Sequence, residues 1–298
     1  MSFKRIAVIG FGEPGPAFAK GFLSTGASDV RAYDILIDDP ERKDAQRRKT
    51  ATLGVTPAAS NAEAVAGAEL VLSTVTSDRA ADVAAESAKS MKPGQVYLDL
   101  NSTSPMKKAK AAEYVEKAGA AYVDGVAMDT VPNFGHRVPL ILSGKTADKL
   151  APLLASHEMQ VEVVGPRVGQ AASIKLTRSI LIKGIEAIFT EAMLTAEKAD
   201  VIERVLASLY VTIPNVDWHR IAGYYTSRLA IHGKRRAAEM DSAADMVEAL
   251  GIEPIVTRAI AARERWSADV GLVKHFDASL KDPTVADFLA AVAKAEGA

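Results

Sequence analysis

The chain has 298 residues, of which 48% are hydrophobic and 24% are charged, values typical of a globular protein large enough for two domains. A formal net charge of −1 gives no reason to expect a nucleic-acid or membrane-surface partner, and the lack of cysteine excludes disulfides and a cysteine nucleophile. No apolar run approaches the roughly 18 residues of a membrane span, and the first predicted strand leaves no room for a signal peptide, so we expect a cytoplasmic protein.

A glycine-rich turn follows the first apolar segment. Residues 6–9 predict a buried parallel strand, and residues 16–23 predict a helix. Between them Gly10 permits a sharp turn, Gly12 leaves room for a pyrophosphate, and Gly15 allows close packing of helix on strand. The free N–H groups of the helix favour a dinucleotide site over a turn without a ligand. The expected cofactor-binding residues are Gly10, Phe11, Gly12, Glu13, Pro14 and Gly15, with the Glu13 carboxylate turned to solvent.

The second predicted strand, over residues 30–34, ends in an acidic residue. Asp34 lies 19 positions after Gly15, where a carboxylate can accept both hydroxyls of an adenosine ribose and would repel a 2′-phosphate. This predicts NAD as the cofactor. NADP stays open, because a side chain of the following basic stretch could reach a 2′-phosphate; this stretch contains Arg42, Lys43, Arg47 and Arg48.

Strand-like segments alternate with helical ones over the rest of the first half. Further strands are expected over residues 69–74, 95–100, 122–127, 139–143 and 161–164. The alternation predicts an α/β fold: a doubly wound, mainly parallel Rossmann sheet with helices on both faces, over residues 1–165. Thr74, Val75 and Thr76 end the strand that would lie beside the cofactor.

The pattern changes at Gly165-Pro166. One long helix is expected from Gly169 to about Lys198, with an apolar stripe of Ile174, Leu181, Ile185, Ile188 and Ala192. The remaining residues also favour helices, with breaks at Pro214, Gly233, 251–254 and Asp282-Pro283. We therefore expect an all-helical second domain over residues 166–298.

Lys175 begins a polar strip on this long helix, which also carries Arg178, Ser179 and Glu186. Polar residues at the start of a buried helix, directly after a domain boundary, are expected to face a cleft. From spacing alone, the alternative is a lysine whose stem packs while its head reaches water.

Three motifs in order make the chain resemble the β-hydroxyacid dehydrogenase family, which includes 3-hydroxyisobutyrate and 6-phosphogluconate dehydrogenases. They are the opening nucleotide motif at residues 7–12, a substrate motif at residues 99–105, and a catalytic helix motif from Gly169 to Ser179. The resemblance covers nearly the whole length. It implies a Rossmann domain, a helical domain that pairs in a homodimer, and hydride exchange between a nicotinamide and a small hydroxy acid.

By this resemblance, Lys175 is the general acid/base that takes the hydroxyl proton as hydride leaves the carbinol carbon. Asn101, Ser102 and Thr103 stand at the substrate motif, and Asn101 also counts among the cofactor-binding positions; helix capping is the structural alternative for Asn101 and Ser102. Ser179, one helical turn after Lys175, is expected to contact the reacting oxygen.

The sequence departs from the family pattern within each of the three motifs, for example at Pro14, and at two further places that bear on the substrate. Met128, Asp129 and Thr130 replace the Ser-Gly-Gly that holds a substrate carboxylate, so Asp129 faces a neutral or cationic group or lies in a loop that turns outward. Ala238 replaces a family lysine, and either Arg235 or Arg236 is expected to bind a carboxylate or phosphate in its place. These differences resemble a branch with a variant C-terminal domain, whose substrate differs.

The sequence thus predicts an NAD(P)-dependent oxidoreductase acting on a small hydroxy acid or its carbonyl counterpart, with no metal site, because no His, Asp or Glu spacing indicates one. Reduction of a C=N bond, as in the related imine reductases, is the alternative within enzymes, although those usually lack the lysine. A non-catalytic dinucleotide-binding sensor is the alternative outside them.

Overall fold

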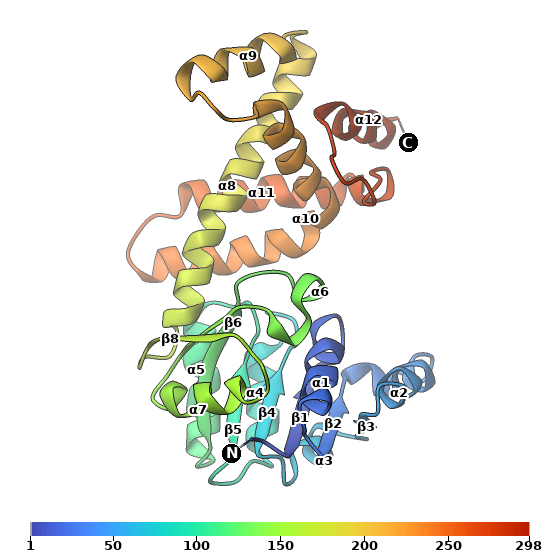
Figure 1. Cartoon of the computed structure of the whole chain (residues 1–298). Coiled ribbons are helices and arrows are strands. Elements are labelled where there is room, and N and C mark those ends of the chain that lie inside the picture. The colour runs from blue at the N-terminus through green and yellow to red at the C-terminus, as the bar shows by residue number, and fades with distance from the viewer. Residues whose placement is uncertain (1, 298) are drawn as a thin grey trace. The chain divides into compact units, whose positions relative to one another are not determined.

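The structure is a computed structural model that describes residues 2–297, and it divides into two compact units, residues 1–175 and 176–298 (Figure 1). The division falls inside helix α8 (Gln170–Lys198) and not at the expected 165/166 boundary. The reason is the first turn of α8, where Ala171 is buried against Val126 and Ile141 of the sheet. This contact makes the start of α8 part of the first unit.

An eight-stranded sheet forms the first unit, in the order β3-β2-β1-β4-β5-β6-β7-β8. Neighbouring strands are parallel except β6 and β7, which are antiparallel. The strands are β1 (Arg5–Ile9), β2 (Asp29–Tyr33), β3 (Thr56–Pro57), β4 (Leu70–Ser73), β5 (Val96–Asp99), β6 (Ala121–Ala127), β7 (Leu140–Ser143) and β8 (Val161–Gly165). The expected strands are confirmed, and the two-residue edge strand β3 is too short to be recognised in the sequence.

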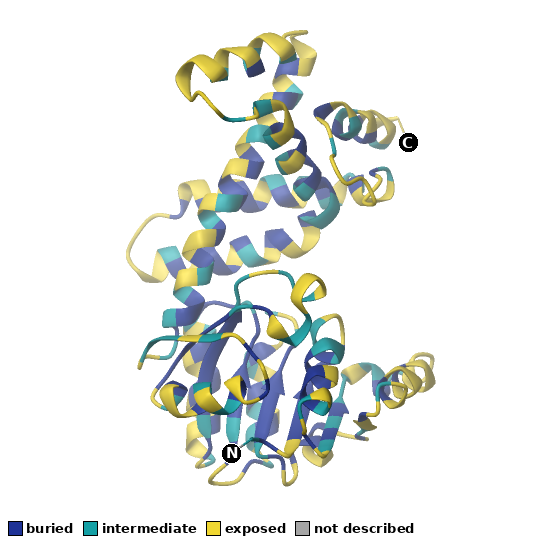
Figure 2. Ribbon diagram, in the orientation of Figure 1, coloured by how far each residue is buried: buried dark blue, intermediate teal, exposed yellow. Residues whose placement is uncertain are grey.

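Helices cover both faces of this sheet, as predicted for a doubly wound fold. Successive strand residues point to opposite faces, so Ile6 and Val8 join one apolar core while Ala7 and Ile9 join the other. The first core includes α1 (Pro14–Ser24) and α7 (Ala147–Ala155); the second includes α3 (Asn61–Val65), α4 (Ala80–Ala88) and α5 (Pro105–Lys117). Figure 2 shows these strands buried between partly exposed helices. The connections also hold η1 (Ile35–Ile37), α2 (Lys43–Ala51), α6 (Val131–Phe134) and η2 (Gly135–Arg137).

The second unit is helical, as expected. After α8 it contains α9 (Ile202–Thr212), α10 (Trp218–Ala249), α11 (Ile255–Asp269), η3 (Leu272–Lys274) and α12 (Val285–Glu296). Within residues 2–297, no helix is both long and apolar enough to cross a membrane.

The expected break at Gly233 is wrong, because α10 runs through this residue without interruption. A Cβ at Gly233 would lie 2.5 Å from the backbone oxygen of Glu264. The glycine is therefore needed for close packing of α10 on α11, and not for ending a helix. The α10 ribbon bends near the middle of its length (Figure 1), which fits a position without a side chain.

The orientation of α8 is the reverse of the one that its apolar stripe predicts. Leu181, Ile185 and Ile188 are exposed, with Leu181 and Ile188 each 67% accessible, whereas Ser179 and Glu186 of the polar strip are buried. The polar side of α8 can face inward because Glu239 and Arg236 of α10 supply partners of opposite charge for Lys183 and Glu186. Among residues 2–297, no other element covers this exposed apolar stripe.

Candidate active site

The glycine turn has the geometry expected of a dinucleotide site. Gly10 has φ +90°, and a Cβ there would come within 2.6 Å of the Thr74 carbonyl oxygen, so a side chain is excluded. A Cβ at Gly15 would meet the Gly10 carbonyl oxygen at 2.3 Å, which reflects the close approach of α1 to the turn. A Cβ at Gly12 would meet no atom within 4 Å. Gly12 thus borders the open space at the N-terminus of α1 where a pyrophosphate can lie.

The residues next to these glycines complete the turn. Phe11 is buried, whereas Glu13 is exposed, as expected. The helix α1 begins at Pro14, two residues before the predicted start, because proline fits the first helical turn and lacks only an N–H that would be unpaired there.

Asp34 directly follows β2 and is tied to the glycine turn. Its carboxylate accepts hydrogen bonds from the backbone N–H of Phe11 at 2.6 Å and of Leu36 at 3.0 Å. The side chain is half-buried, and each oxygen keeps a lone pair for a further donor such as a ribose hydroxyl. The position of Asp34 beside the turn is therefore compatible with the role predicted for it.

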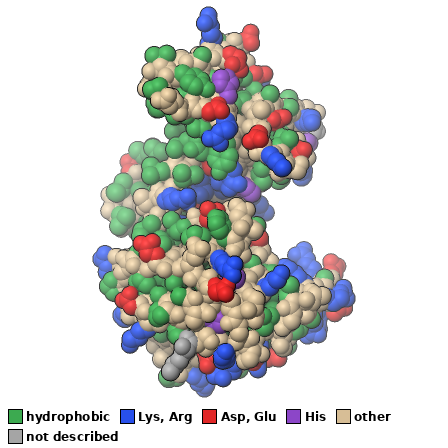
Figure 3. Space-filling model, in the orientation of Figure 1, with side chains coloured by type: hydrophobic (Ala, Val, Ile, Leu, Met, Phe, Trp, Pro, Cys, Tyr) green, Lys and Arg blue, Asp and Glu red, His purple; other side chains and the backbone are tan. Residues whose placement is uncertain are grey.

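Lys49 of α2 is a residue that the sequence reasoning missed. Its ammonium group donates to the carbonyl oxygens of Phe11 at 2.8 Å and of Gly12 at 2.9 Å. Figure 3 shows basic side chains gathered over α2, and Lys49 is the member of this group that contacts the turn. The basic composition of residues 42–49 was the available signal, but no spacing rule singles out Lys49.

The loops after β4 and β5 are joined by Asn101. Its side-chain oxygen accepts from the Val75 N–H at 2.6 Å, and its side-chain nitrogen donates to Ser73 Oγ at 3.0 Å. Thr74 donates its hydroxyl to the Gly10 carbonyl oxygen at 2.7 Å. These bonds fix three strand ends at the point where the strand order reverses, which is where open parallel sheets bind ligands. Thr76 lies further out and is exposed.

The substrate-motif residues have distinct positions. Thr103 is 1% exposed and donates its hydroxyl to the Ser77 carbonyl oxygen, and Asn101 is 2% exposed, so both side chains stabilise the loop and are poor candidates for substrate contact. Ser104, and neither Asn101 nor Ser102, caps α5. Ser102 is half-buried and remains available at the loop surface.

Lys175 and Ser102 meet in this unit, as the predicted site requires. Lys175 Nζ donates to Ser102 Oγ at 2.8 Å, although the two residues lie 73 positions apart in the chain. The contact brings the first turns of α8 to the carboxyl end of β5. An amine and a hydroxyl held at this distance can both form hydrogen bonds to a third polar group that lies beside them, and the amine can exchange a proton with it.

A buried charge network lies beneath this pair and was not foreseen. Lys108 Nζ, with no exposed surface, lies 2.9 Å from Asp99 Oδ1 and 3.2 Å from Asp124 Oδ1. Asp124 Oδ2 accepts from the N–H groups of Gly169 at 3.0 Å and Ala172 at 3.2 Å, at the start of α8. The network therefore fixes the N-terminus of the helix that carries Lys175 against β5 and β6.

The segment after β6 turns away from the sheet edge. Asp129 is exposed, and its carboxylate accepts from the N–H of the next residue, Thr130, at 2.6 Å. Met128 packs beside Val126 in the apolar cluster that includes Ala171. Asp129 thus lies in a loop that turns outward, which is one of the two arrangements expected for it.

In the second unit, Ser179 and Arg236 are occupied by other side chains. Ser179 is 4% exposed, donates to Glu239 Oε1 at 2.6 Å and accepts from Lys183 at 3.2 Å, so its predicted contact with the reacting oxygen is not supported. Arg236 is 6% exposed and forms ion pairs with Glu186 and Glu264. Burial and these two ion pairs leave the guanidinium little room for a ligand, so the geometry does not favour Arg236 as the substrate clamp.

Arg235 is exposed and keeps its charge available, so it is the arginine of the pair that can bind a ligand. Lys183, a further residue that the sequence reasoning missed, lies 3.2 Å from Glu239 Oε1, and burial lowers its pKa. Within the described residues, no group of three or more His, Asp or Glu side chains could hold a metal ion.

Comparison with known proteins identifies the family. Residues 5–127 match the NAD binding domain of 6-phosphogluconate dehydrogenase, and residues 196–267 match a domain of unknown function, DUF1932. A conserved protein of unknown function, whose structure is described as similar to 3-hydroxyacid dehydrogenases, is 28% identical, with 89% of this chain and 97% of that one covered and a TM-score of 0.72. The chain belongs to the β-hydroxyacid dehydrogenase family.

Two further solved structures are similar to this chain over almost its whole length. A conserved hypothetical protein from Sinorhizobium meliloti is 35% identical, over 98% of this chain and 96% of that one, with a TM-score of 0.78. The 3-hydroxyisobutyrate dehydrogenase of Mycobacterium tuberculosis has the same fold, with a TM-score of 0.72 over 99% of both chains at 17% identity. The DUF1932 match confirms the branch with a variant second domain. The match to this NAD binding domain supports the interpretation that the chain is an oxidoreductase that uses a nicotinamide dinucleotide.

Proposed function

We propose that the chain is an NAD(P)-dependent dehydrogenase of a small hydroxy acid, or a reductase of the matching carbonyl compound, with Lys175 as general acid/base. The observation that carries this proposal is the 2.8 Å hydrogen bond between Lys175 Nζ and Ser102 Oγ at the carboxyl end of β5. The contact supports the proposal, because the Lys175 amine lies at the carboxyl ends of the strands, where the glycine turn also follows β1.

The chemistry follows from the charges of the reacting groups. A bound nicotinamide supplies the hydride acceptor or donor. In oxidation, Lys175 takes the hydroxyl proton while Ser102 holds the same oxygen by a hydrogen bond; in reduction, the ammonium group donates a proton to the forming alkoxide. The network of Lys108 and Asp124 keeps the amine in place during either step.

The predicted cofactor residues would divide the dinucleotide between them. The turn from Gly10 to Gly15 would hold the pyrophosphate, Asp34 the ribose hydroxyls, and residues 74–76 the edge of the nicotinamide half. Asp34 supports NAD, while Lys49 beside the turn supplies a positive charge that NADP could use. We assign NAD as the preferred cofactor.

For the substrate, Ser102 is the side chain that the geometry favours. Asn101 and Thr103 stabilise the loop, and Met128 packs in the apolar cluster that includes Ala171 of α8. Thr130, which precedes α6, stays a candidate for substrate contact. Arg235 is kept as a candidate for a carboxylate or phosphate group.

The proposal is tested by measuring turnover of a panel of small hydroxy acids through the absorbance of the reduced nicotinamide. Lys175→Ala is expected to fold and bind NADH with unchanged affinity, yet to lose about 10²- to 10⁴-fold in kcat. Lys145→Ala, at an exposed lysine paired with Glu116, is the matched control and should keep full activity.

Other outcomes would point elsewhere. Near-normal turnover by Lys175→Ala would overturn the assignment of the general acid/base. Intact cofactor binding without turnover of any hydroxy acid would favour a dinucleotide sensor. Turnover of cyclic imines alone would favour C=N reduction.

The exposed apolar stripe of α8 supports a homodimer. Leu181, Ile185 and Ile188 lie on one side of the helix and no other part of the described chain covers them. Exposed apolar surface of this kind marks interaction sites. We assign this stripe to contact with a second copy of the chain.

A further inference from the structure

Two charged side chains hold the backbone of the glycine turn at Phe11. The Asp34 carboxylate accepts the Phe11 N–H at 2.6 Å, and the Lys49 ammonium group donates to the Phe11 carbonyl oxygen at 2.8 Å. Lys49 also donates to the Gly12 carbonyl oxygen at 2.9 Å. Two successive carbonyl groups of the turn therefore share one cation from α2.

These contacts determine the direction of two N–H groups. A trans peptide unit is planar, with its C=O and N–H on opposite sides. The carbonyl groups of Phe11 and Gly12 point to Lys49. The N–H groups of the residues that follow them, Gly12 and Glu13, therefore point away from it. Neither N–H group donates a hydrogen bond to any of residues 2–297, so both are free donors directly before α1 begins at Pro14.

Two free N–H groups at the start of a helix suit a pyrophosphate. Backbone N–H groups and the helix dipole both favour a negatively charged group at this position. Gly12 leaves space there, since a Cβ at this residue would meet no atom within 4 Å. The match of residues 5–127 to an NAD binding domain makes a dinucleotide the expected source of the phosphates.

Lys49 is committed to the turn by several contacts. Its ammonium group lies 5.8 Å from the centroid of the Phe11 ring, which is 1% exposed. The buried side chain of Gln46, one helical turn earlier in α2, donates to the same Phe11 carbonyl oxygen at 3.4 Å. Arg42, by contrast, pairs with Asp39 at 3.4 Å, whereas no carboxylate among residues 2–297 forms an ion pair with Lys49. The charge of Lys49 is therefore not neutralised.

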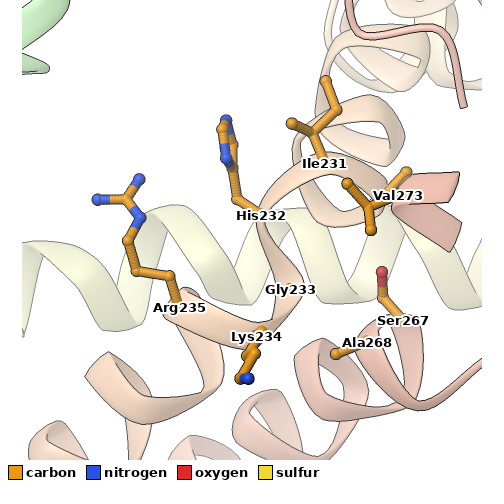
Figure 4. A pocket seen from close by; sticks show the side chains of 9 residues that line it. Ile231, His232, Gly233, Lys234, Arg235, Ser267, Ala268 and Val273 are labelled. Carbon is orange, nitrogen blue, oxygen red and sulfur yellow. The ribbon is translucent and has the colours of Figure 1, made fainter. Parts of the chain in front are cut away.

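The cavity of the second unit does not offer such donors. Its volume is about 250 Å³, below the roughly 300 Å³ at which ligand pockets start. Figure 4 shows Lys234 and Arg235, which line it, extending in different directions from α10. Both residues lie within an uninterrupted helix, where backbone N–H groups are bonded along the helix. Phosphate recognition by free N–H groups thus belongs to the glycine turn.

We propose that Lys49 is a positioning residue of the dinucleotide site, which holds two carbonyl groups of the glycine turn so that the N–H groups of Gly12 and Glu13 stay available to the pyrophosphate. This role rests on the proposed nicotinamide cofactor. Because NADH and NADPH share the pyrophosphate, Lys49 acts on the affinity for both. Contact with a 2′-phosphate would instead change the affinity for NADPH alone.

The test is fluorescence titration of the full chain with NADH and, separately, with NADPH. Lys49→Met keeps a long side chain but removes the donors, so both affinities should fall about tenfold. Lys49→Arg should recover most of the loss, since a guanidinium can also donate to two carbonyl oxygens. Lys43→Met removes one charge from an exposed position at the start of the same helix and should bind as the unaltered chain does.

Urea unfolding separates positioning from a general loss of structure. Lys49 is exposed, so Lys49→Met should leave the urea midpoint unchanged while both dinucleotides bind more weakly. A lowered midpoint that accompanies the weaker binding, without recovery in Lys49→Arg, would reduce Lys49 to a structural role and overturn the proposal.

The remaining outcomes are equally distinct. Equal NADH affinity of the unaltered chain and Lys49→Met would overturn the positioning role, and a loss confined to NADPH would assign Lys49 to the 2′-phosphate. An equal loss in Lys43→Met would reduce the effect to net charge. Failure of the unaltered chain to bind either dinucleotide would overturn the cofactor assignment, and this role with it. Loss of turnover in Lys175→Ala with unchanged NADH affinity bears only on the proposed reaction.

Discussion

Lys175 Nζ and Ser102 Oγ are joined by a 2.8 Å hydrogen bond between the first turns of α8 and the loop after β5. Ser102→Ala removes the acceptor without disturbing a cap, because Ser104 caps α5. A hydrogen bond to a charged group contributes about 1.5–3 kcal/mol, so we expect kcat to fall about 10- to 100-fold. Cofactor affinity should stay unchanged in a fluorescence titration. Ser208→Ala on the exposed face of α9 is the control, and equal activity of the two variants would remove Ser102 from the site.

The stability of the first unit depends on Asp124. Its carboxylate faces Lys108 and accepts two N–H groups at the start of α8, and neither charged side chain is exposed. Lys108 keeps Asp99 as a partner in Asp124→Asn, so the main loss is that of the charge-assisted hydrogen bonds from the start of α8. We expect the free energy of unfolding in urea to fall by about 1.5–3 kcal/mol. The substitution should also lower kcat more than it weakens cofactor binding, because the start of α8 loses its anchor.

Asp129→Asn is the matched control for Asp124→Asn. Asp129 is exposed and accepts only from the neighbouring Thr130, so its substitution should change the unfolding free energy by less than about 0.5 kcal/mol. A small effect of Asp124→Asn, equal to that of the control, would show that the network does not stabilise α8.

Local patterns in the sequence predicted much of the fold. The strand, glycine turn and helix of residues 5–24 depend on neighbours in the chain, and alternating segments of similar length were enough to predict the order of strands and helices. The Lys108–Asp124 pair could not be predicted, because its partners lie on different elements and neither residue belongs to a motif.

The buried side of α8 is a second feature that the sequence pattern could not predict. The apolar residues recur with the helical period, but this spacing does not determine which side of the helix is buried. The polar side can be buried instead when another helix supplies charged partners for it. Arg236, which pairs with the buried Glu186, lies on α10, 50 residues later in the chain. The role of Gly233 could not be predicted either, because a glycine needed for close helix packing has the same sequence signal as one that ends a helix.

The stability of the helical unit should depend on pH through Glu264. Burial is the main cause that raises its pKa from 4.5 to about 7, so the folded chain binds a proton that the unfolded chain releases between these values. Stability contributed by the neutral acid is thus lost as pH rises from about 4.5 through 7. Glu264→Gln should be more stable than the unaltered chain at pH 8, by about 1–3 kcal/mol, and little different at pH 5.

Urea unfolding at both pH values measures the Glu264 effect. Glu248→Gln, at an exposed carboxylate paired with Arg258, is the control and should show no such pH-dependent gain. His232 acts in the opposite direction, since its lowered pKa removes stability as pH falls from 6.5 toward 4. Loss of stability in Glu264→Gln at pH 8 would mean that pairing with Arg236 outweighs the cost of burial.

The exposed apolar stripe of α8 predicts a homodimer that a single substitution to aspartate in the stripe should dissociate. Leu181 and Ile188 are each 67% exposed, and a carboxylate at either position would have to be buried without a partner in a dimer interface. Leu181→Asp and Ile188→Asp should therefore elute as monomers in light-scattering chromatography, while the unaltered chain elutes as a dimer. Val211→Asp, at an 87% exposed position on α9, should remain dimeric. A monomeric unaltered chain, or a dimer that survives both α8 substitutions, would place any interface elsewhere.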